Sequence, residues 1–184
     1  MNQEQTLIDN TIKGNTSSFS VIVEIYQEQI FNFINKYILS KQDSEEICQE
    51  VFIRAFYNLK KYNSRWSFSS WLHTIAINTI KNHFRKMKNT PKRVYNNETM
   101  NNIPSSKNNP EIDYESKIER SIIINLISEL NDNQKNAFIL RYLQGFSYDE
   151  IGKILCTSTS AAKMKVQRAK KRLFKKYLKY KKEQ

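Results

Sequence analysis

The sequence has few of the residues that turn, rigidify or cross-link a chain. Of 184 residues only 3 are Gly, 3 are Pro and 2 are Cys, which disfavours sheet-rich folds with many tight turns and excludes a disulfide framework. No apolar run approaches the roughly 18 residues of a membrane span, and residues 1–10 lack the apolar core of a signal peptide. The sequence therefore predicts a helical protein in the cytosol, with no membrane insertion.

Groups that could build a catalytic or metal centre are equally scarce. His73 and His83 are the two histidines, and neither has a thiol or a carboxylate pair at ligand spacing. The three glycines are spread along the chain and cannot form a phosphate-binding loop. We therefore expect no cofactor, no metal and no enzymatic activity. His73 is expected to point to solvent or to lie at a helix boundary.

Positive charge is concentrated in two blocks. The net charge is +12. Residues 81–93 hold 6 basic and no acidic residues, and residues 141–184 hold 13 basic and 3 acidic ones, whereas the remaining segments are slightly acidic. Two separate basic blocks indicate two places that meet phosphate, and the plainer alternative is a pair of solvated helix faces.

Helical periodicity divides the chain into two modules. Apolar residues recur at steps of three and four from about residue 6 to 86, and again from about 112 to 180. All three prolines fall between these stretches, among Asn, Ser and Lys without an apolar period, which is typical of a flexible linker. The sequence thus predicts an all-α chain of two small helical domains, residues 1–88 and 112–184, joined by a flexible linker at 89–111.

Local signals place the ends of several helices. Asp43 followed by Glu46 predicts an N-terminal capping box, and Ser147 followed by Glu150 predicts a second one. Gly145 fits the end of a helix, because glycine enters the left-handed region at low cost. Before that helix, Asn131 or its neighbour Asp132 can supply the N-cap.

The end of the second domain has the pattern of a helix-turn-helix. A short helix ends near residue 155, and Ser158 or Thr159 can cap a long cationic helix after the turn. Such a helix fits the major groove of DNA, with its first residues at base edges and its later cations at phosphates. Ala162, Val166, Ala169 and Leu173 would form its packed face. The candidates for reading duplex DNA are Thr159, Ser160, Ala161, Lys163, Met164, Lys165, Gln167, Arg168 and Lys171.

A family resemblance begins in residues 151–173, which read IGKILCTSTSAAKMKVQRAKKRL. This segment resembles the helix-turn-helix of bacterial RNA polymerase sigma factors, most closely the extracytoplasmic-function (ECF) branch of the sigma-70 family. Residues 43–56 (DSEEICQEVFIRAF) are similar to its polymerase-clamp-binding helix, and residues 67–78 (SFSSWLHTIAIN) to its promoter-opening helix. The chain departs from the family at Cys156 and Ser160, where glycine is usual.

The resemblance implies a function and a set of partners. A sigma factor binds core RNA polymerase and directs it to promoters, reading the −35 duplex with its helix-turn-helix and capturing melted −10 bases with its first domain. Glu46, Gln49 and Glu50 would contact the clamp helices of the β′ subunit. The β flap, promoter DNA and an anti-sigma protein complete the expected partners. The resemblance assigns these residues to the −10 element: Tyr62, Asn63, Arg65, Trp66, Trp71, Asn78, Lys81 and Arg85.

Two other classes of protein compete with this interpretation. A stand-alone helix-turn-helix regulator would use the second domain as its reader and the first for dimerisation. An enzyme such as a nuclease needs acidic metal ligands near a basic cleft, and the sequence shows no such cluster. Within the first domain, Trp66 has the alternative of folding back on the core, and Trp71 is expected to belong mainly to the core.

Overall fold

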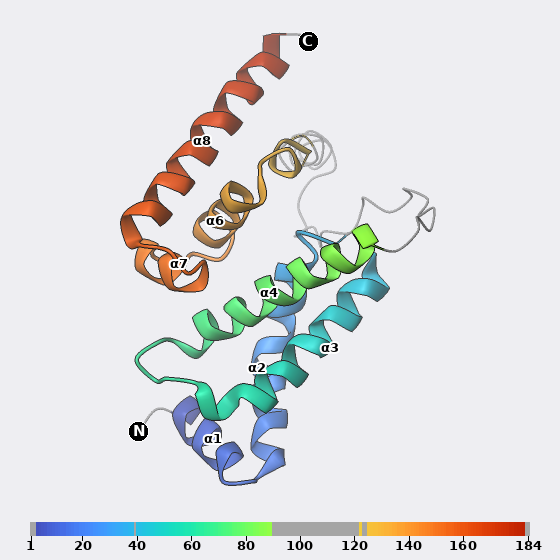
Figure 1. The fold of residues 1–184 in the computed structure, drawn as a ribbon, viewed down its shortest axis with the longest axis vertical. Coiled ribbons are helices and arrows are strands. Elements are labelled where there is room, and N and C mark those ends of the chain that lie inside the picture. The colour runs from blue at the N-terminus through green and yellow to red at the C-terminus, as the bar shows by residue number, and fades with distance from the viewer. Residues whose placement is uncertain (1–2, 39, 90–121, 123–124, 183–184) are drawn as a thin grey trace, which may run out of the picture. The chain divides into compact units, whose positions relative to one another are not determined.

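The computed structural model describes residues 3–38, 40–89, 122 and 125–182, and its regular elements in these ranges are all helices (Figure 1). The chain divides into two compact units between residues 102 and 103. The predicted all-α organisation in two helical domains is confirmed. Except for residue 89, the predicted linker lies outside the described residues, and the domain boundaries stay predictions. No helix in the described ranges combines the length and apolar character that crossing a bilayer requires.

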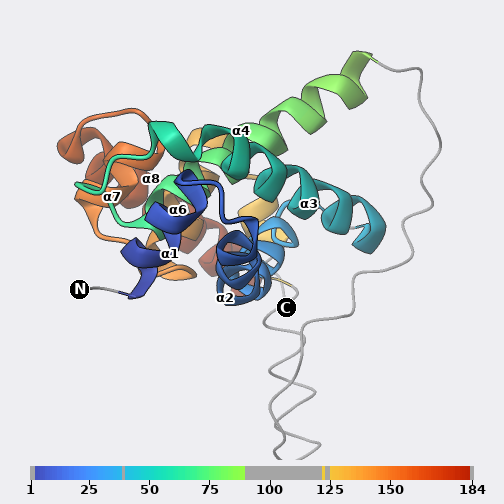
Figure 2. The same cartoon turned by 90° about the horizontal axis from the view of Figure 1, so that it is seen from below.

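The first unit is a small bundle built around α2 and α3. Its helices are α1 (Gln3–Ile12), α2 (Thr16–Ile34), α3 (Lys41–Asn58), the short 3-10 helix η1 (Leu59–Lys61) and α4 (Phe68–Asn89). Helix α1 packs on α2, and α3 packs on both α2 and α4. Figure 1 and Figure 2 both show α3 and α4 side by side, with the loop between them at one end of the bundle.

Helix α3 begins one turn earlier than its sequence predicts. Its N-cap is Ser40, whose side chain accepts a hydrogen bond from the Asp43 backbone nitrogen at 3.2 Å. The predicted capping box opening at Asp43 is therefore wrong, because Ser40 supplies the acceptor three residues before it. Asp43 instead lies in the first turn, where a negative charge favours the positive end of the helix dipole.

The core of the first unit closes over residues from each of its long helices. The sequence predicts that His73 points to solvent or lies at a helix boundary. This prediction is wrong, because the His73 side chain is 0% exposed and lies in the core. Its Nδ1 atom lies 2.8 Å from the Ser69 carbonyl oxygen, and its ring packs edge-on against Phe33 at 4.8 Å. The side chain shares the inward face of α4 with Leu72 and Ala76, so it packs as part of the core. The fully buried large side chains of this unit include Ile8, Ile22, Ile30, Phe33, Ile34, Val51, Phe68 and Leu72.

The second unit consists of short helices laid against one long helix. Residues 125–128 are helical, and α6 (Asp132–Tyr142), α7 (Tyr148–Ile154) and α8 (Thr159–Lys182) follow. Helix α8 packs on both α6 and α7 (Figure 1). Ala162, Val166 and Ala169 are buried, which confirms them as the packed face of α8, whereas the fourth predicted residue, Leu173, is half-buried. The small size of the three buried residues lets the backbones approach closely.

Three of the predicted N-terminal caps are confirmed. The Asn131 side chain accepts from the Gln134 nitrogen at 2.9 Å. Ser147 and Glu150 form the reciprocal capping box at the start of α7. At the start of α8, the Ser158 hydroxyl accepts from the backbone nitrogen of the third residue after it, at 3.2 Å. These caps satisfy backbone donors that the first helical turn leaves unpaired.

The predicted stop after α6 is confirmed as well. Gly145 has a φ of 76°, the left-handed conformation that reverses the chain after a helix. The Phe146 nitrogen then donates to the Leu140 carbonyl oxygen at 3.0 Å, and the Phe146 side chain is buried. This pattern of a glycine, a six-residue closing bond and an apolar contact ends the helix firmly.

Candidate polymerase and nucleic-acid interfaces

The turn between α7 and α8 is tight, and two of its residues set the geometry. A Cβ atom on Gly152 would lie 2.9 Å from the Thr157 carbonyl oxygen and 3.3 Å from the Thr159 nitrogen, so only glycine allows this approach. Cys156 has a φ of 51°, which costs a non-glycine residue about 1 kcal/mol or more. The turn therefore keeps the helix-turn-helix geometry without a glycine at residue 156, and the Cys156 backbone carries the strain.

The outward face of α8 lies on the side of the helix opposite its buried residues. Opposite Ala162 and Val166, a stripe of residues four, three and four apart shares one surface of the helix. This stripe is Ser160, Met164, Gln167 and Lys171, all exposed.

The other predicted reading residues of α8 flank this stripe. Lys163 and Arg168 are exposed on either side, whereas Ala161 and Lys165 are half-buried at the edge of the packed face. The predicted set therefore shares one helix but does not share one face.

The first turn of α8 is tied to α7. The Thr159 hydroxyl donates to the Asp149 carboxylate at 3.3 Å, and Lys153 donates to the same carboxylate at 2.6 Å. The hydrogen bond from Lys153 lowers the pKa of Asp149 below its usual value. Ser160 shares a hydrogen bond with Ser158 at 3.1 Å. These contacts orient the start of the helix that would enter the groove.

The loop before α4 is a hydrogen-bonded turn. The Trp66 nitrogen donates to the Asn63 carbonyl oxygen at 3.0 Å, and the Arg65 nitrogen donates to the Asn63 side-chain oxygen at 3.0 Å. Asn63 and Arg65 are exposed, and Trp66 is half-buried. The loop thus presents an amide, a guanidinium and an indole, which are groups that can hold unstacked bases and phosphate.

Tyr62 begins this loop and faces inward. Its hydroxyl donates to the Trp66 carbonyl oxygen at 2.6 Å, and its ring lies 5.4 Å from the rings of both Phe68 and Trp71. Burial, helped by the nearby Glu4 carboxylate, raises the pKa of Tyr62. The hydroxyl therefore stays protonated as a hydrogen-bond donor. Trp71 is half-buried within the same aromatic cluster.

A second set of predicted residues follows one face of α4. Asn78, Lys81 and Arg85 are three and four residues apart, and all three are exposed. Asn78 lies ten residues after α4 begins at Phe68, about 15 Å along the helix axis, so the three side chains form a polar track along the later turns of the helix. Cations at this spacing can follow the phosphates of a strand.

The predicted polymerase-binding residues lie together on α3. Glu46 and Gln49 are exposed, and Glu46 accepts a hydrogen bond from Gln42 at 3.3 Å. Glu50 is half-exposed and pairs with Arg54 in a two-pronged contact at 2.9 and 2.5 Å. Glu46 therefore carries the more available negative charge, whereas the Glu50 charge is partly balanced within its own helix.

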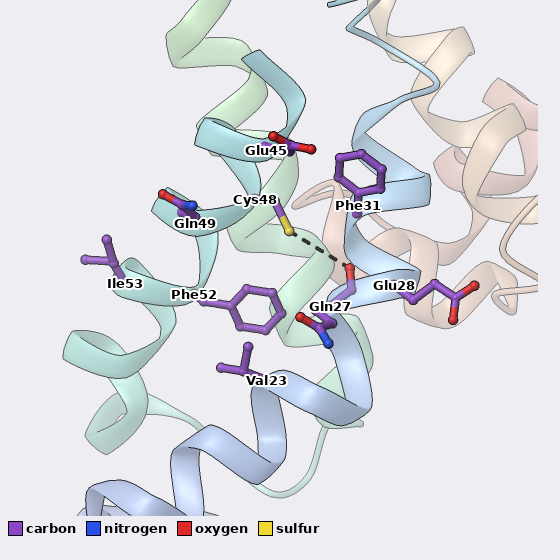
Figure 3. A pocket seen from close by; sticks show the side chains of 9 residues that line it. All are labelled: Val23, Gln27, Glu28, Phe31, Glu45, Cys48, Gln49, Phe52 and Ile53. Carbon is purple, nitrogen blue, oxygen red and sulfur yellow. Dashed lines mark hydrogen bonds between the residues drawn. The ribbon is translucent and has the colours of Figure 1, made fainter. Parts of the chain in front are cut away.

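A groove between α2 and α3 continues this surface (Figure 3). It has a volume of about 660 Å³, and Ile53 at its rim is 56% exposed. Glu28, Glu45 and Gln49 surround an apolar floor, so the groove fits an apolar side chain on a basic partner. Its lining residues are Val23, Gln27, Glu28, Phe31, Glu45, Cys48, Gln49, Phe52 and Ile53.

The sequence reasoning missed this groove. Ile53 lies four residues after Gln49 and seven after Glu46, so its place on the same face of α3 could have been found from spacing alone. Val23 and Phe31 come from another helix, and only the packing of α2 on α3 brings them to the site (Figure 3).

Comparisons with known proteins agree with both modules. Residues 22–90 match the family described as Sigma-70 region 2, and residues 120–173 match Sigma-70, region 4. The first match contains the loop, α3 and α4, and the second contains the helix-turn-helix. Together the two regions occupy most of the chain, in the order that the resemblance predicts.

Whole-chain relatives extend the agreement. The ECF RNA polymerase sigma-E factor of Haemophilus influenzae is 26% identical over 174 residues, which are 91% of each chain. The factor of the same name from Escherichia coli strain K12 is 28% identical over 173 residues, which are 91% of this chain and 90% of the relative.

Solved structures show the same fold. CnrH, in complex with the cytosolic domain of CnrY, has a TM-score of 0.69 at 17% identity and matches 94% of this chain and 95% of its own. The sigma factor RpoE of Bartonella quintana, in complex with the anti-sigma factor NepR, has a TM-score of 0.66 at 19% identity, over 84% and 93% of the two chains. The chain matches Sigma-70 regions 2 and 4 in order and ECF sigma-E factors over 91% of its residues, and it therefore belongs to the ECF branch of the sigma-70 family.

Proposed function

We propose that this chain is a transcription initiation factor that binds core RNA polymerase and directs it to promoters, with no enzymatic step of its own. Region 2 binds the −10 element and region 4 binds the −35 element. The observation that carries this function is the union, in one chain, of an acidic and apolar face on α3 with a helix-turn-helix whose reading helix is cationic. We place its action in the cytoplasm, where polymerase and promoter DNA are found.

Region 4 reads the −35 element as a duplex. Helix α8 enters the major groove with Ser160, Met164 and Gln167 toward base edges, because these residues lie on its outward face near the start. Lys171 follows on the same stripe and meets phosphate, flanked by Lys163 and Arg168. Lys165 and Ala161 contribute from the edge of the face. Thr159 stays bonded to Asp149 and orients the helix.

Region 2 captures the melted −10 strand. Unpaired bases bind the loop through the Asn63 amide, the Arg65 guanidinium and the Trp66 indole, since aromatic faces and amides hold bases that have left the stack. Asn78, Lys81 and Arg85 then carry the strand along α4. Strand opening is driven by preferential binding of single-stranded bases, with Trp71 supporting the loop from beneath.

Core polymerase binds the adjoining face of region 2. Glu46, Gln49 and Glu50 receive the clamp helices of the β′ subunit, and an apolar side chain of the same partner fills the groove beside Ile53. Charge complementarity steers the encounter, and the groove supplies desolvated apolar contact. Region 4 contacts the β flap, and an anti-sigma protein would compete for these surfaces.

Two isoleucines provide a matched test of the polymerase interface. Ile53 and Ile25 are both 56% exposed, but only Ile53 lines the groove. Ile53→Ala should weaken the affinity for core polymerase about tenfold, the scale of a truncated interface anchor, and Ile25→Ala should leave it within twofold. Fluorescence titration of the labelled chain with core polymerase measures both.

The charge contribution has its own control. Glu46→Gln removes a carboxylate from α3, and Asp9→Asn removes an exposed one from α1. Only Glu46→Gln should weaken binding, and its effect should shrink at high salt. If core polymerase fails to bind the wild-type chain, or if both members of each pair weaken it equally, the proposed interface is wrong.

A further inference from the structure

We propose that Tyr62 is the positioning residue of the −10 loop: it holds residues 63–66 in the shape that receives melted DNA, and it does so through the module's interior. This inference rests on the proposed function of region 2 and adds a residue that acts on the loop from within. Three features of Tyr62 carry it, namely one hydrogen bond, one aromatic cluster and the exposure of the residues that it encloses.

The hydrogen bond of the Tyr62 hydroxyl spans the turn formed by residues 63–66. Asn63 and Trp66 form the inner bond of the turn at 3.0 Å, and the Tyr62 hydroxyl adds an outer one to the Trp66 carbonyl oxygen at 2.6 Å. The outer bond joins the first residue of the loop to the last residue of the turn. A loop closed twice in this way loses less conformational entropy when a base binds.

The aromatic cluster anchors that bond to the bundle. The Tyr62 ring is perpendicular to that of Phe68, at 85°, and it also contacts Trp71. Phe68 is 1% exposed, so it belongs to the core. Tyr26 of α2 completes the cluster at 5.3 Å from Phe68. The loop is therefore attached to rigid elements through a ring that is only partly accessible.

The hydrogen bonds that hold the loop leave its indole and amide NH₂ groups available for binding a base. Tyr62 bonds the carbonyl of Trp66 and not its indole, and the Asn63 side-chain oxygen bonds within the turn, which leaves the amide NH₂ for a base. Beyond the turn, Ser67 and Ser70 share a hydrogen bond at 2.7 Å. Within the span that the Tyr62–Trp66 hydrogen bond closes, the side chains of Asn63 and Arg65 are exposed.

The test compares two hydroxyl deletions in the same cluster. Tyr62→Phe removes the bond to the loop and keeps the ring. Tyr26→Phe removes a hydroxyl that donates to the Glu4 carboxylate of α1 and keeps its contact with Phe68. Amide hydrogen exchange in the full chain should become about fivefold faster at residues 63–67 in Tyr62→Phe, the equivalent of one hydrogen bond, and should stay unchanged there in Tyr26→Phe.

A second readout concerns promoter choice. Promoters are first selected from a random upstream library with wild-type chain and core polymerase, and single-base variants of each element are then compared. Tyr62→Phe should reduce discrimination among −10 variants about fivefold and leave discrimination among −35 variants unchanged. Tyr26→Phe should match the wild type in both.

Three results would overturn the proposal. Unchanged loop exchange in Tyr62→Phe, with weaker −10 discrimination, would make Tyr62 a direct DNA contact. Equal losses at −10 and −35 variants would reduce its role to general stability. Unchanged exchange and unchanged discrimination would remove any role. Failure of the wild-type chain to select a promoter would instead contradict the proposed function, and the exchange measurement would still decide whether Tyr62 orders the loop.

Discussion

Single residues in the helix-turn-helix show how local strain and close approach are divided along the chain. Gly152 has no Cβ atom, so the backbone of residues 157–159 can approach it closely. It therefore acts through its size. Cys156 adopts a left-handed φ of 51° that glycine would adopt freely, so it acts through conformation. The turn therefore keeps glycine where nothing else fits and replaces it where the cost is moderate.

Cys156→Gly should stabilise the second unit by about 0.5 to 1 kcal/mol, because the relief of left-handed strain exceeds the added entropy of the unfolded chain. Cys156→Ala is the control, since it removes the thiol and keeps the strain. Amide hydrogen exchange of α7 and α8 in the full chain measures both. The explanation by strain fails if alanine stabilises the unit as much as glycine does.

The two thiols should differ in reactivity. Burial raises the pKa of Cys48 to about 11, so at pH 8 only about one molecule in a thousand carries the thiolate. Cys156 is exposed. Iodoacetamide at pH 8 should therefore modify Cys156 at least about 100-fold faster than Cys48, as followed by peptide mass spectrometry. In denaturant the two rates should converge, and similar rates in the native chain would contradict the burial of Cys48.

At the scale of elements, α8 separates its tasks by face. Small residues pack inward against α6 and α7, a polar and flexible stripe points outward at the start, and cations follow. Because Ser160, Met164 and Gln167 come first on the outward stripe and Lys171 comes a turn later, one helix can read bases and bind phosphate with different side chains. The half-buried position of Lys165 assigns it a smaller share than its charge alone suggests.

This division predicts two kinds of defect in −35 binding. Lys171→Ala should weaken binding evenly across −35 sequences and lower the slope of log affinity against log salt by about 1. Gln167→Ala should change the preferred −35 sequence and leave the slope unchanged. Salt titrations of the chain with core polymerase on selected promoter variants test both. A change of preference in Lys171→Ala would contradict its assignment to phosphate.

Much of this architecture could be predicted because its determinants are local. The caps at Asn131, Ser147 and Ser158 lie within three residues of the atoms they bind, and Gly145 is recognised by its backbone freedom. The start of α3 was misplaced because two acceptors, Ser40 and Asp43, offer the same pattern one turn apart. Such alternatives are decided by the packing of the whole helix.

The remaining differences arise from tertiary packing. His73 is polar by type but occupies an inward position of α4, so periodicity and polarity disagree there and packing decides. The groove needs Val23 from α2 beside Ile53 from α3, and the aromatic cluster around Tyr62 needs Tyr26 from α2 beside Phe68 from α4. Contacts between residues far apart in sequence leave no local pattern in a single amino-acid sequence.

At the scale of the whole molecule, the proposed function depends on two promoter contacts, one made by region 2 and the other by region 4 of the same chain. Region 2 carries the proposed polymerase face and the proposed −10 loop, and region 4 carries most of the excess positive charge. Because the two regions are covalently joined, binding of one raises the effective concentration of the other at its own promoter element. Neither region alone would set a start site with the same selectivity.

Run-off transcription with purified core polymerase on a random upstream library tests this central claim most directly. We expect the chain to move initiation to a subset of templates that share two short elements, and we expect alanine at Ile53 to reduce every product together. Transcripts with the same start sites and the same yields, whether or not the chain is added, would contradict the whole account.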